Sequence, residues 1–262
     1  MTTPVSYQTD HRGITRITLD RPDVRNAFDD QVILELTAAF ETAARDPECR
    51  VVVLAGAGKH FSAGADLNWM KGTAKLSPAA NKEDARQLAK LMRTLDTLPK
   101  PTLVRIQGAA YGGALGLICA CDIAIAADNA RFCLSEVRLG IAPAAIGPYV
   151  IKAIGQRQAR RYMQTAEEIT APRALDLGLV HEVVPETELD SWVDTLATRL
   201  LNNGPQGMAA TKALIARTGN NQPDDALTDY TADVIAGLRT GEEGQEGLQA
   251  FFDKRKPSWA KG

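Results

Sequence analysis

The chain has 262 residues, of which 45 % are hydrophobic and 24 % are charged, so it can bury a sizeable core. Its formal net charge of -2 gives no electrostatic reason to bind nucleic acid or an acidic membrane surface, and we expect neither partner. The four cysteines show no CxxC spacing, and the amino-terminal segment has no signal-like apolar run. These features disfavour a disulfide framework and are typical of a cytoplasmic protein with buried thiols.

Strands and helices alternate over the first half of the chain. Apolar runs, alternating or continuous, predict strands at 13–21, 50–56, 102–108 and 122–127. Asp29 is the predicted N-cap of a helix after the first strand, and a polar helix is expected at 79–98. This interleaved order predicts an α/β fold and not one with segregated layers.

The pattern changes in the last third of the chain. Helical periodicity is found in four consecutive segments, at 188–203, 205–218, 223–238 and 241–254. We therefore expect an α/β core over residues 1–190 and a helical region over residues 191–262. The helices would close over a cleft or bind another subunit.

Two loops of small residues follow predicted strands. The stretch KHFSAGADLNWMK (59–71) contains Ser62-Ala63-Gly64-Ala65, and Asp66 is expected to cap a helix that begins at Leu67. The stretch Tyr111-Gly112-Gly113-Ala114 repeats the order of strand, glycine turn and helix start. Small residues let the main chain approach a ligand, and two such loops facing each other would hold one oxygen as it becomes anionic.

Several other chemistries lack their sequence pattern. The segment 56–59 is not a phosphate loop, because His60 follows the lysine where a serine or threonine is needed. Ser62 has no GxSxG context, so no hydrolase nucleophile is indicated. The three histidines lie far apart and unpaired, and we expect no metal site.

The ordered motifs between residues 61 and 143 resemble the enoyl-CoA hydratase/isomerase (crotonase) superfamily. They are FSAGADL, GAAYGGALGLICACDIAIAADNARF and LSEVRLGIAP, and the likeness extends from RPDVRNAF (21–28) to FFDKRKPSW (251–259). The resemblance implies a crotonase-like spiral of ββα units with a helical C-terminal trimerisation region, assembled as a homotrimer or a homohexamer (a dimer of trimers). It also implies an acyl-CoA substrate, with coenzyme A as part of that substrate and no separate cofactor.

The resemblance also assigns catalytic residues. In this superfamily two peptide N–H groups hold the thioester oxygen, and they map here to Ala63 and Gly113. Two-glutamate hydratases carry one acid at the place of Gly116 and another at the place of Glu136, so this chain keeps one carboxylate. Glu136 is the candidate general acid/base. Tyr111, Asn68 and Tyr149 are candidate helpers, and no aspartate follows the GIAP segment, which argues against the aspartate-assisted branch.

A narrower likeness points to the substrate. HFSAGADLNWM, GGALGL, FCLSEVRLGIAPA, IGQRQARRY and EGQEGLQAF resemble bacterial methylglutaconyl-CoA and isohexenylglutaconyl-CoA hydratases of leucine and acyclic terpene degradation. Both substrates are β-branched enoyl thioesters that bear a carboxylate, and hydration gives a tertiary 3-hydroxyacyl-CoA. Lys71, Arg93 and Arg138 are the candidates to meet that carboxylate.

Further substrate contacts are implied by family analogy. The residues concerned are Arg25, Phe61, Ser62, Ala65, Asp66, Gly112 and Lys254. Lys254 is the first residue of a basic cluster at 254–256. This cluster would either contact the CoA phosphates across a subunit boundary or form an exposed tail. Two alternatives to hydration stay open: a single-glutamate enoyl-CoA isomerase, and a non-catalytic RNA-binding or scaffold relative, which the near-neutral charge disfavours.

Overall fold

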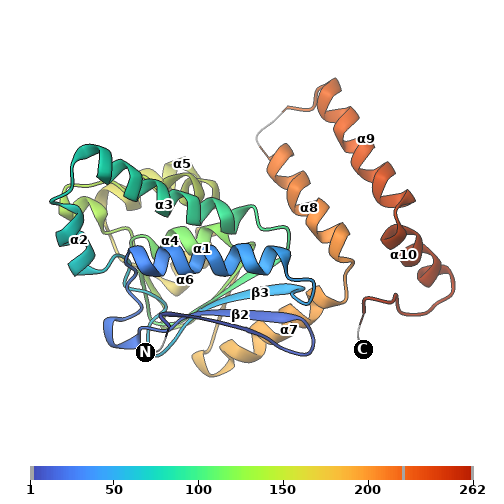
Figure 1. Cartoon of the computed structure of the whole chain (residues 1–262), viewed down its shortest axis with the longest axis horizontal. Helices are drawn as coiled ribbons and strands as arrows, with labels where there is room; N and C mark the ends of the chain where they lie inside the picture. Colours follow the sequence, from blue (N-terminus) through green and yellow to red (C-terminus); the bar gives the residue numbers. More distant parts are fainter. Residues whose placement is uncertain (1–2, 220–221, 261–262) are drawn as a thin grey trace.

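The computed structural model, shown in Figure 1, describes residues 3–219 and 222–260. It contains a main mixed sheet with the strand order β1-β2-β3-β4-β6-β9. Its strands are β1 (Val5–Thr9), β2 (Ile14–Leu19), β3 (Val51–Gly56), β4 (Thr102–Ile106), β6 (Ile123–Ala127) and β9 (Glu182–Val184). Only the β1–β2 pair of this sheet is antiparallel. The carboxyl ends of β2, β3, β4, β6 and β9 therefore lie along one edge of the sheet.

A second, short sheet continues from that edge. It has the order β5-β7-β8 and consists of β5 (Ala109–Tyr111), β7 (Arg131–Cys133) and β8 (Ile169–Thr170). The β5–β7 pair is parallel, so β5 and β7 present their carboxyl ends together. The residues that follow them include both the Gly112-Gly113 turn and Glu136.

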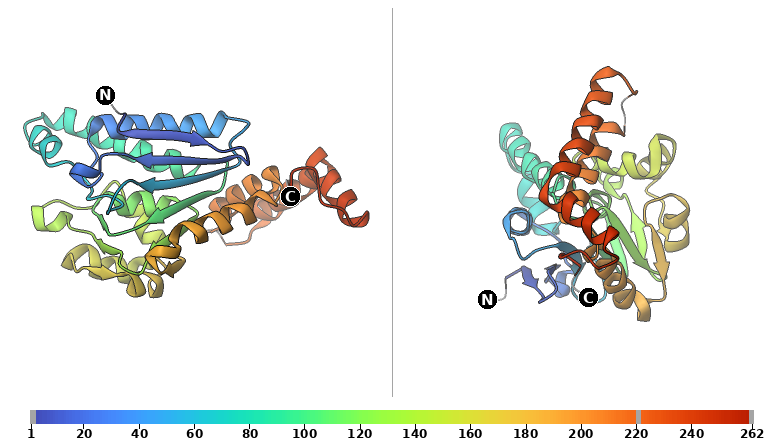
Figure 2. Two further views of the ribbon diagram at one scale, coloured as in Figure 1. Left: turned by 90° about the horizontal axis from the view of Figure 1, so that it is seen from below. Right: turned by 90° about the vertical axis from the view of Figure 1, so that its right-hand side faces the viewer.

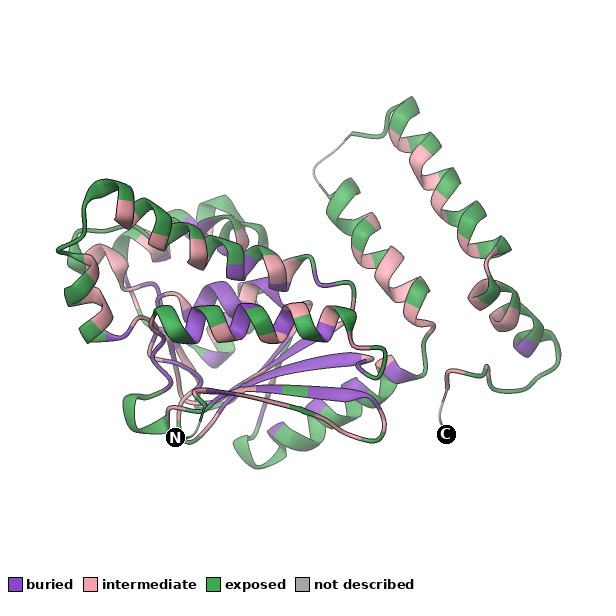
Figure 3. Cartoon of the chain, in the orientation of Figure 1, coloured by how far each residue is buried: buried purple, intermediate pink, exposed green. Residues whose placement is uncertain are grey.

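Helices cover both faces of the main sheet (Figure 3). On one face lie α1 (Asp30–Arg45), α3 (Pro78–Asp96), α4 (Ala114–Ala120), α5 (Gly147–Thr165) and α6 (Ala171–Asp176), with the short α2 (Leu67–Thr73) beside them. Strand β3 is buried along its whole length, with Val52 and Leu54 in the core on that face and Val51 and Val53 in the core on the other. This is why its sequence is continuously apolar.

The opposite face of the sheet is covered by α7 (Leu189–Leu201). Its buried residues Leu189, Val193 and Ala197 share a cluster with residues of β3, β4 and β6. Helix α7 thus packs on the α/β core, although it falls mostly within the segment 191–262 that the sequence assigned to the helical region. Helical periodicity shows that a segment has an apolar face, but it does not show which surface that face packs against.

The remaining helices form an arm that extends from the core (Figure 2). The arm consists of α8 (Pro205–Thr218), α9 (Asp225–Thr240) and α10 (Glu242–Phe252), and among their described residues only Ala250 is fully buried. Lys212 of α8 pairs with Asp122, which lies just before β6. The arm therefore joins the core at the amino-terminal edge of the strands.

Most predicted elements are present, with shifted ends. The predicted caps are confirmed: Asp29 accepts the Val32 N–H at the start of α1, and Asp66 accepts the N–H groups of Asn68 and Trp69 at the start of α2. All four cysteines are free thiols. No helix in the described part of the chain has both the length and the apolar character that crossing a membrane requires.

Candidate active site

The two small-residue loops lie side by side at the carboxyl edge of the strands. The Ser62 N–H donates to the Ala109 carbonyl at 3.1 Å, and the Tyr111 N–H donates back to the Ser62 carbonyl at 3.0 Å. Gly64, with φ of +84°, packs so tightly that a Cβ atom there would lie 2.5 Å from the Tyr111 carbonyl oxygen. A glycine is needed at this position, both for its conformation and for its size.

The hydrogen bonds of the first loop identify the amide that is open to a ligand. The Ala63 N–H donates to the Arg25 carbonyl at 2.9 Å, which contradicts the prediction that Ala63 is an oxyanion donor. The N–H groups of Gly64 and Asp66 also have acceptors within the protein. The Ala65 N–H has no acceptor among the described residues, so the open donor lies two residues later than predicted.

The second loop supplies a matching donor. Gly112, with φ of +54°, uses its own N–H to bond the Cys133 carbonyl at 2.8 Å. The next amide, that of Gly113, has no acceptor in the described part of the chain, so it is free to donate to a ligand. A Cβ at Gly113 would lie 2.7 Å from the Phe28 ring, so the absence of a side chain is required there.

Glu136 lies beside the second loop. It is half-buried at the start of the 3-10 turn Glu136–Leu139, and a Cβ at Gly112 would lie 3.5 Å from its Oε1. Its Oε2 is buried and has no hydrogen-bond partner among the described residues. Burial raises the pKa of the Glu136 carboxyl above its usual range. A buried carboxyl oxygen without a partner is unusual in a folded protein and suits a group that exchanges protons with a substrate.

The place of the second family glutamate is filled with apolar side chains. A Cβ at Gly116 would lie 2.8 Å from Ile146 Cβ and 2.9 Å from Met92 Sδ. Ile146 is 2 % exposed and Met92 is fully buried. The missing carboxylate has therefore not left a water-filled gap.

None of the three candidate helpers has a described hydrogen bond to Glu136. The Tyr111 hydroxyl donates to Glu168 Oε2 at 3.1 Å, and Asn68 is exposed on α2. Burial raises the pKa of the Tyr149 hydroxyl, with Asp96 adding to the rise and Arg93 opposing it. The charged neighbours of Tyr149 thus belong to the end of α3.

Two of the predicted substrate contacts are enclosed by protein. Phe61 and Ser62 are both 0 % exposed, and their N–H groups bond to the carbonyls of Gln107 and Ala109. Their complete burial contradicts the prediction that they contact the substrate. Their hydrogen bonds instead attach the loop to the segment 107–109. Asp66 is also nearly buried, and its carboxylate serves the cap of α2 and an ion pair with Arg21.

The basic residues that were predicted to contact the substrate do not all lie near the two loops. Arg25 is exposed next to the first loop, with its carbonyl bonded to the Ala63 N–H. Lys254 is exposed at the end of the arm, whose attachment lies at the opposite edge of the sheet, so it does not join the site of its own chain. Of the candidates for the substrate carboxylate, Lys71 and Arg93 are exposed, and Arg138 donates to the Ala166 carbonyl at 2.6 Å.

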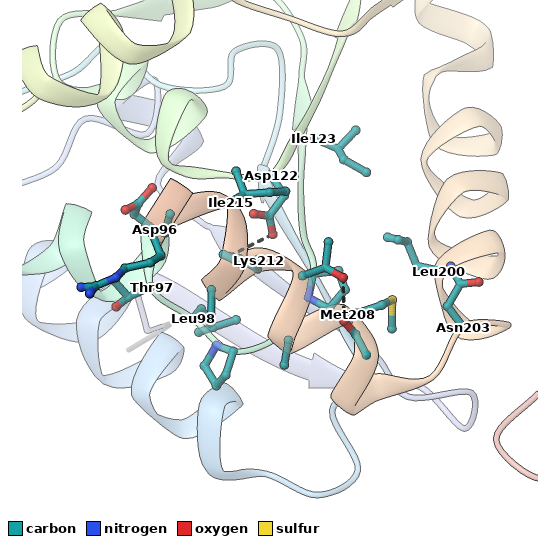
Figure 4. A pocket seen from close by; sticks show the side chains of 18 of the residues that line it. Asp96, Thr97, Leu98, Asp122, Ile123, Leu200, Asn203, Met208, Lys212 and Ile215 are labelled. Atoms are coloured by element: carbon teal, nitrogen blue, oxygen red, sulfur yellow. Dashed lines mark hydrogen bonds and ion pairs between the residues drawn. The ribbon is translucent and has the colours of Figure 1, made fainter. Parts of the chain in front are cut away.

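A large cavity lies away from these loops, between the arm and the core. It measures about 1100 Å³ and is lined by the segments that precede β4 and β6 together with residues of α8 and α9 (Figure 4). Asp122 and Lys212 form an ion pair of 2.9 Å in its lining (Figure 4). No group of three or more His, Cys, Asp or Glu side chains that would hold a metal is found within residues 3–219 and 222–260.

Comparison with known proteins agrees with this arrangement. Residues 9–262 match the family described as enoyl-CoA hydratase/isomerase. The chain belongs to this family. A crystal structure of an enoyl-CoA hydratase from Shewanella pealeana is 48 % identical, with a TM-score of 0.95 over 98 % of this chain and 96 % of that one. The structure of Pseudomonas aeruginosa AtuE is 37 % identical, with a TM-score of 0.94 over 98 % and 100 % of the two chains.

A curated relative gives the same family. The 2,3-dehydroadipyl-CoA hydratase of Escherichia coli is 32 % identical over 244 residues, which cover 93 % of each chain. The solved enoyl-CoA hydratase/isomerase structures confirm the expected crotonase-like fold, including its carboxyl-terminal helices.

Proposed function

We propose that this protein is an enoyl-CoA hydratase, a hydro-lyase that adds water across the double bond of a β-branched enoyl-CoA carrying a carboxylate. One observation carries the proposal: the open amides of Ala65 and Gly113 and the unpartnered carboxyl oxygen of Glu136 belong to adjoining loops at one edge of the sheet. Family membership supports an acyl-CoA thioester as the substrate.

The two amides would bind the thioester oxygen. During attack at C3, electrons move from the double bond through C2 to this oxygen, which becomes an enolate. N–H donors that are already in place stabilise that charge, and one such donor typically contributes about 10²–10³ in kcat. The main chain of Ala65 and Gly113 thus performs the electrophilic part of the reaction.

Glu136 would transfer the protons. As a carboxylate it takes one proton from the water whose oxygen bonds to C3. The resulting carboxylic acid then gives that proton to C2 of the enolate, which restores the thioester and the carboxylate. The apolar packing at Gly116 supports a mechanism in which a single carboxylate does both steps.

The acyl group is proposed from two observations. The motifs around the site resemble those of methylglutaconyl-CoA and isohexenylglutaconyl-CoA hydratases, and the relative from Escherichia coli is named for a dicarboxylic enoyl thioester. Lys71 and Arg138 extend from α2 and from the turn after Glu136, the two segments that flank the site. We propose that one of them meets the substrate carboxylate, in leucine or acyclic terpene degradation.

The substrate class is tested by comparing kcat/KM for 3-methylglutaconyl-CoA, isohexenylglutaconyl-CoA and unbranched crotonyl-CoA. We expect at least one branched substrate to exceed crotonyl-CoA, and Lys71→Met or Arg138→Met to remove that preference. Equal or better turnover of crotonyl-CoA would contradict the proposed substrate class without affecting the assignment as a hydratase.

Isomerisation is the second candidate, because one carboxylate suffices to carry a proton between two carbons and the second position is apolar. Incubation of a conjugated branched enoyl-CoA in oxygen-18 water separates the two reactions. We expect a 3-hydroxyacyl-CoA that carries the heavy oxygen at C3. A shifted double bond without label would overturn hydration.

We further propose a cytoplasmic homotrimer or dimer of trimers, with no separate cofactor. The support is the arm, on which Phe251 and Phe252 are 76 % and 71 % exposed. Sedimentation analysis of the full chain tests it, and a monomer at micromolar concentration would contradict it.

A further inference from the structure

A buried polar pair that the proposed reaction does not use lies beneath the first loop. Asn26 is 1 % exposed and Ser62 is 0 % exposed. Asn26 lies just before α1, whereas Ser62 follows β3, so the pair joins two segments that are 36 residues apart. Buried polar side chains are costly unless their hydrogen bonds are made, so such a pair needs a reason.

Asn26 makes five hydrogen bonds that fix this region, one of them from its own N–H to the Arg21 carbonyl at 2.8 Å. Its side-chain Oδ1 accepts the Arg21 N–H at 2.9 Å, and its Nδ2 donates to the carbonyls of Ala57 and His60 at 2.8 Å each. Its own carbonyl accepts the Ser62 hydroxyl at 2.8 Å. Asn26 therefore holds the loop between β3 and α2 at three places.

The backbone of Asn26 also restricts the choice of residue. Its φ is +54°, as is that of Arg25, so two consecutive residues adopt the left-handed conformation. Asparagine tolerates this conformation better than most side chains, and glycine adopts it freely. Asparagine combines this tolerance with two side-chain donors, which glycine does not have.

Ser62 connects Asn26 to the backbone segment that carries the open amide of Ala65. Its Oγ accepts the Gly64 N–H at 3.1 Å, and Phe28 then bonds to both neighbours of Ala65, accepting the Asp66 N–H and donating to the Gly64 carbonyl. The C=O and N–H groups of one trans peptide point in opposite directions, and the Ala65 N–H shares its peptide group with the Gly64 carbonyl. Because the Gly64 carbonyl points towards the Phe28 N–H, the Ala65 N–H points away from Phe28 and stays open.

We propose that Asn26 and Ser62 are positioning residues that aim the Ala65 N–H at the thioester oxygen. They touch neither substrate nor reacting atoms and act through the backbone of residues 62–66. The inference rests on the proposed function for its catalytic consequence, whereas the orientation of the amide can be measured without turnover.

The test uses Ser62→Ala and the stronger variant Asn26→Gly, which keeps the left-handed conformation and removes the side-chain bonds. Thr37→Val is the matched control, because Thr37 is a buried residue of α1 whose hydroxyl donates to the Ile33 carbonyl at 2.7 Å, within the helix. All three variants lose buried hydrogen bonds and therefore some stability. Only the first two lose bonds that shape the loop.

Two readouts are compared in the full-length protein. In alanine-labelled protein, the Ala65 amide resonance should shift or broaden in Ser62→Ala and Asn26→Gly and coincide with wild type in Thr37→Val. In the hydration assay, kcat should fall by about 10- to 100-fold in the two loop variants, as for small misplacements of a catalytic group, while KM stays close to wild type. Thr37→Val should keep the wild-type kcat.

The two readouts separate the possible failures. An unchanged Ala65 resonance and an unchanged kcat in Ser62→Ala, with only a lower melting temperature, would overturn the inference. A wild-type protein that hydrates no enoyl-CoA would overturn the proposed function, and the amide resonance would still decide whether the pair orients Ala65.

Discussion

The active-site loops and the cavity beside the arm differ in whether their polar groups have partners within the protein. In the cavity, Asp122 accepts the Thr102 N–H at 2.8 Å, the Thr102 hydroxyl at 2.9 Å and Lys212 Nζ at 2.9 Å. In the loops, Glu136 Oε2 is buried without a partner, and two amides have no acceptor within the described residues. The carboxylate at the cavity therefore has its partners within the protein, whereas the polar groups of the loops do not.

This difference shows that volume is a poor guide to chemistry in this fold. The Asp122 carboxylate, which serves stability, is paired within the protein, because an unpaired buried polar group costs about 1–3 kcal/mol. Groups that serve a reaction are left open for the substrate to pair. If the open groups carry the function, changing them should affect the reaction, whereas changing the ion pair at the large cavity should affect stability alone.

Glu136→Gln should have the largest effect. The amide has nearly the shape of the carboxyl group but cannot take and return a proton, so kcat should fall by about 10²–10⁴-fold. Steady-state kinetics with the preferred branched enoyl-CoA provides the measurement. Activity equal to wild type would show that another group transfers the proton.

Gly116→Glu should destabilise the protein without improving hydration. The new side chain would meet Ile146 and Met92 in a closed part of the core, and overpacking of this kind costs about 1–3 kcal/mol, to which the buried carboxylate adds. Urea unfolding measures the loss. Gly72→Ala is the control, since a Cβ there meets nothing within 4 Å, and it should leave stability unchanged or slightly raised.

Lys212→Met should affect stability and not chemistry. The ion pair with Asp122 is largely shielded, with 18 % of the Lys212 side chain exposed, so its loss should lower the free energy of unfolding by about 1 kcal/mol. The kcat should remain that of the wild type. Arg86→Met breaks an exposed pair with Glu83 and should change neither quantity. A large loss of kcat in Lys212→Met would mean that the cavity takes part in the reaction.

The smallest expected effect is a pH dependence from Glu136. Burial raises its pKa in the folded protein above the ordinary 4.5, so folding favours the protonated form. The contribution of this group to stability is therefore greatest below pH 4.5 and falls as the pH rises through the folded pKa. Glu136→Gln should gain stability relative to wild type at neutral pH and lose that advantage in acid, as denaturant unfolding at several pH values would show. The acid limb of kcat/KM should lie above pH 4.5 for the same reason.

Local patterns predicted much of this molecule. The uninterrupted apolar run of β3 indicated a strand covered on both faces, and Asp29 and Asp66 were recognisable as caps because they precede helical spacing. The motif around Glu136 singled it out as a candidate, and the structure places its carboxyl group beside Gly112.

Details that depend on contacts between distant segments were not predictable from local patterns. The motif located the first loop, but whether Ala63 or Ala65 has the open amide is decided by Arg25 and Phe28, which lie before α1. The absence of a carboxylate at Gly116 was evident from the sequence, whereas its replacement by Ile146 required the packing of α4 against α5. The asparagine of RPDVRNAF showed no local sign of its bonds to Ser62 and His60.

The small number of buried side chains in the arm affects where the protein unfolds locally. Helices that bury a single side chain, Ala250, have few contacts to resist local unfolding, whereas the sheet and its covering helices have many. Backbone deuterium uptake should therefore be rapid in α8, α9 and α10 in dilute protein and slow in β3 and β4. Raising the concentration should slow uptake in the arm alone, if a second copy of the chain covers it.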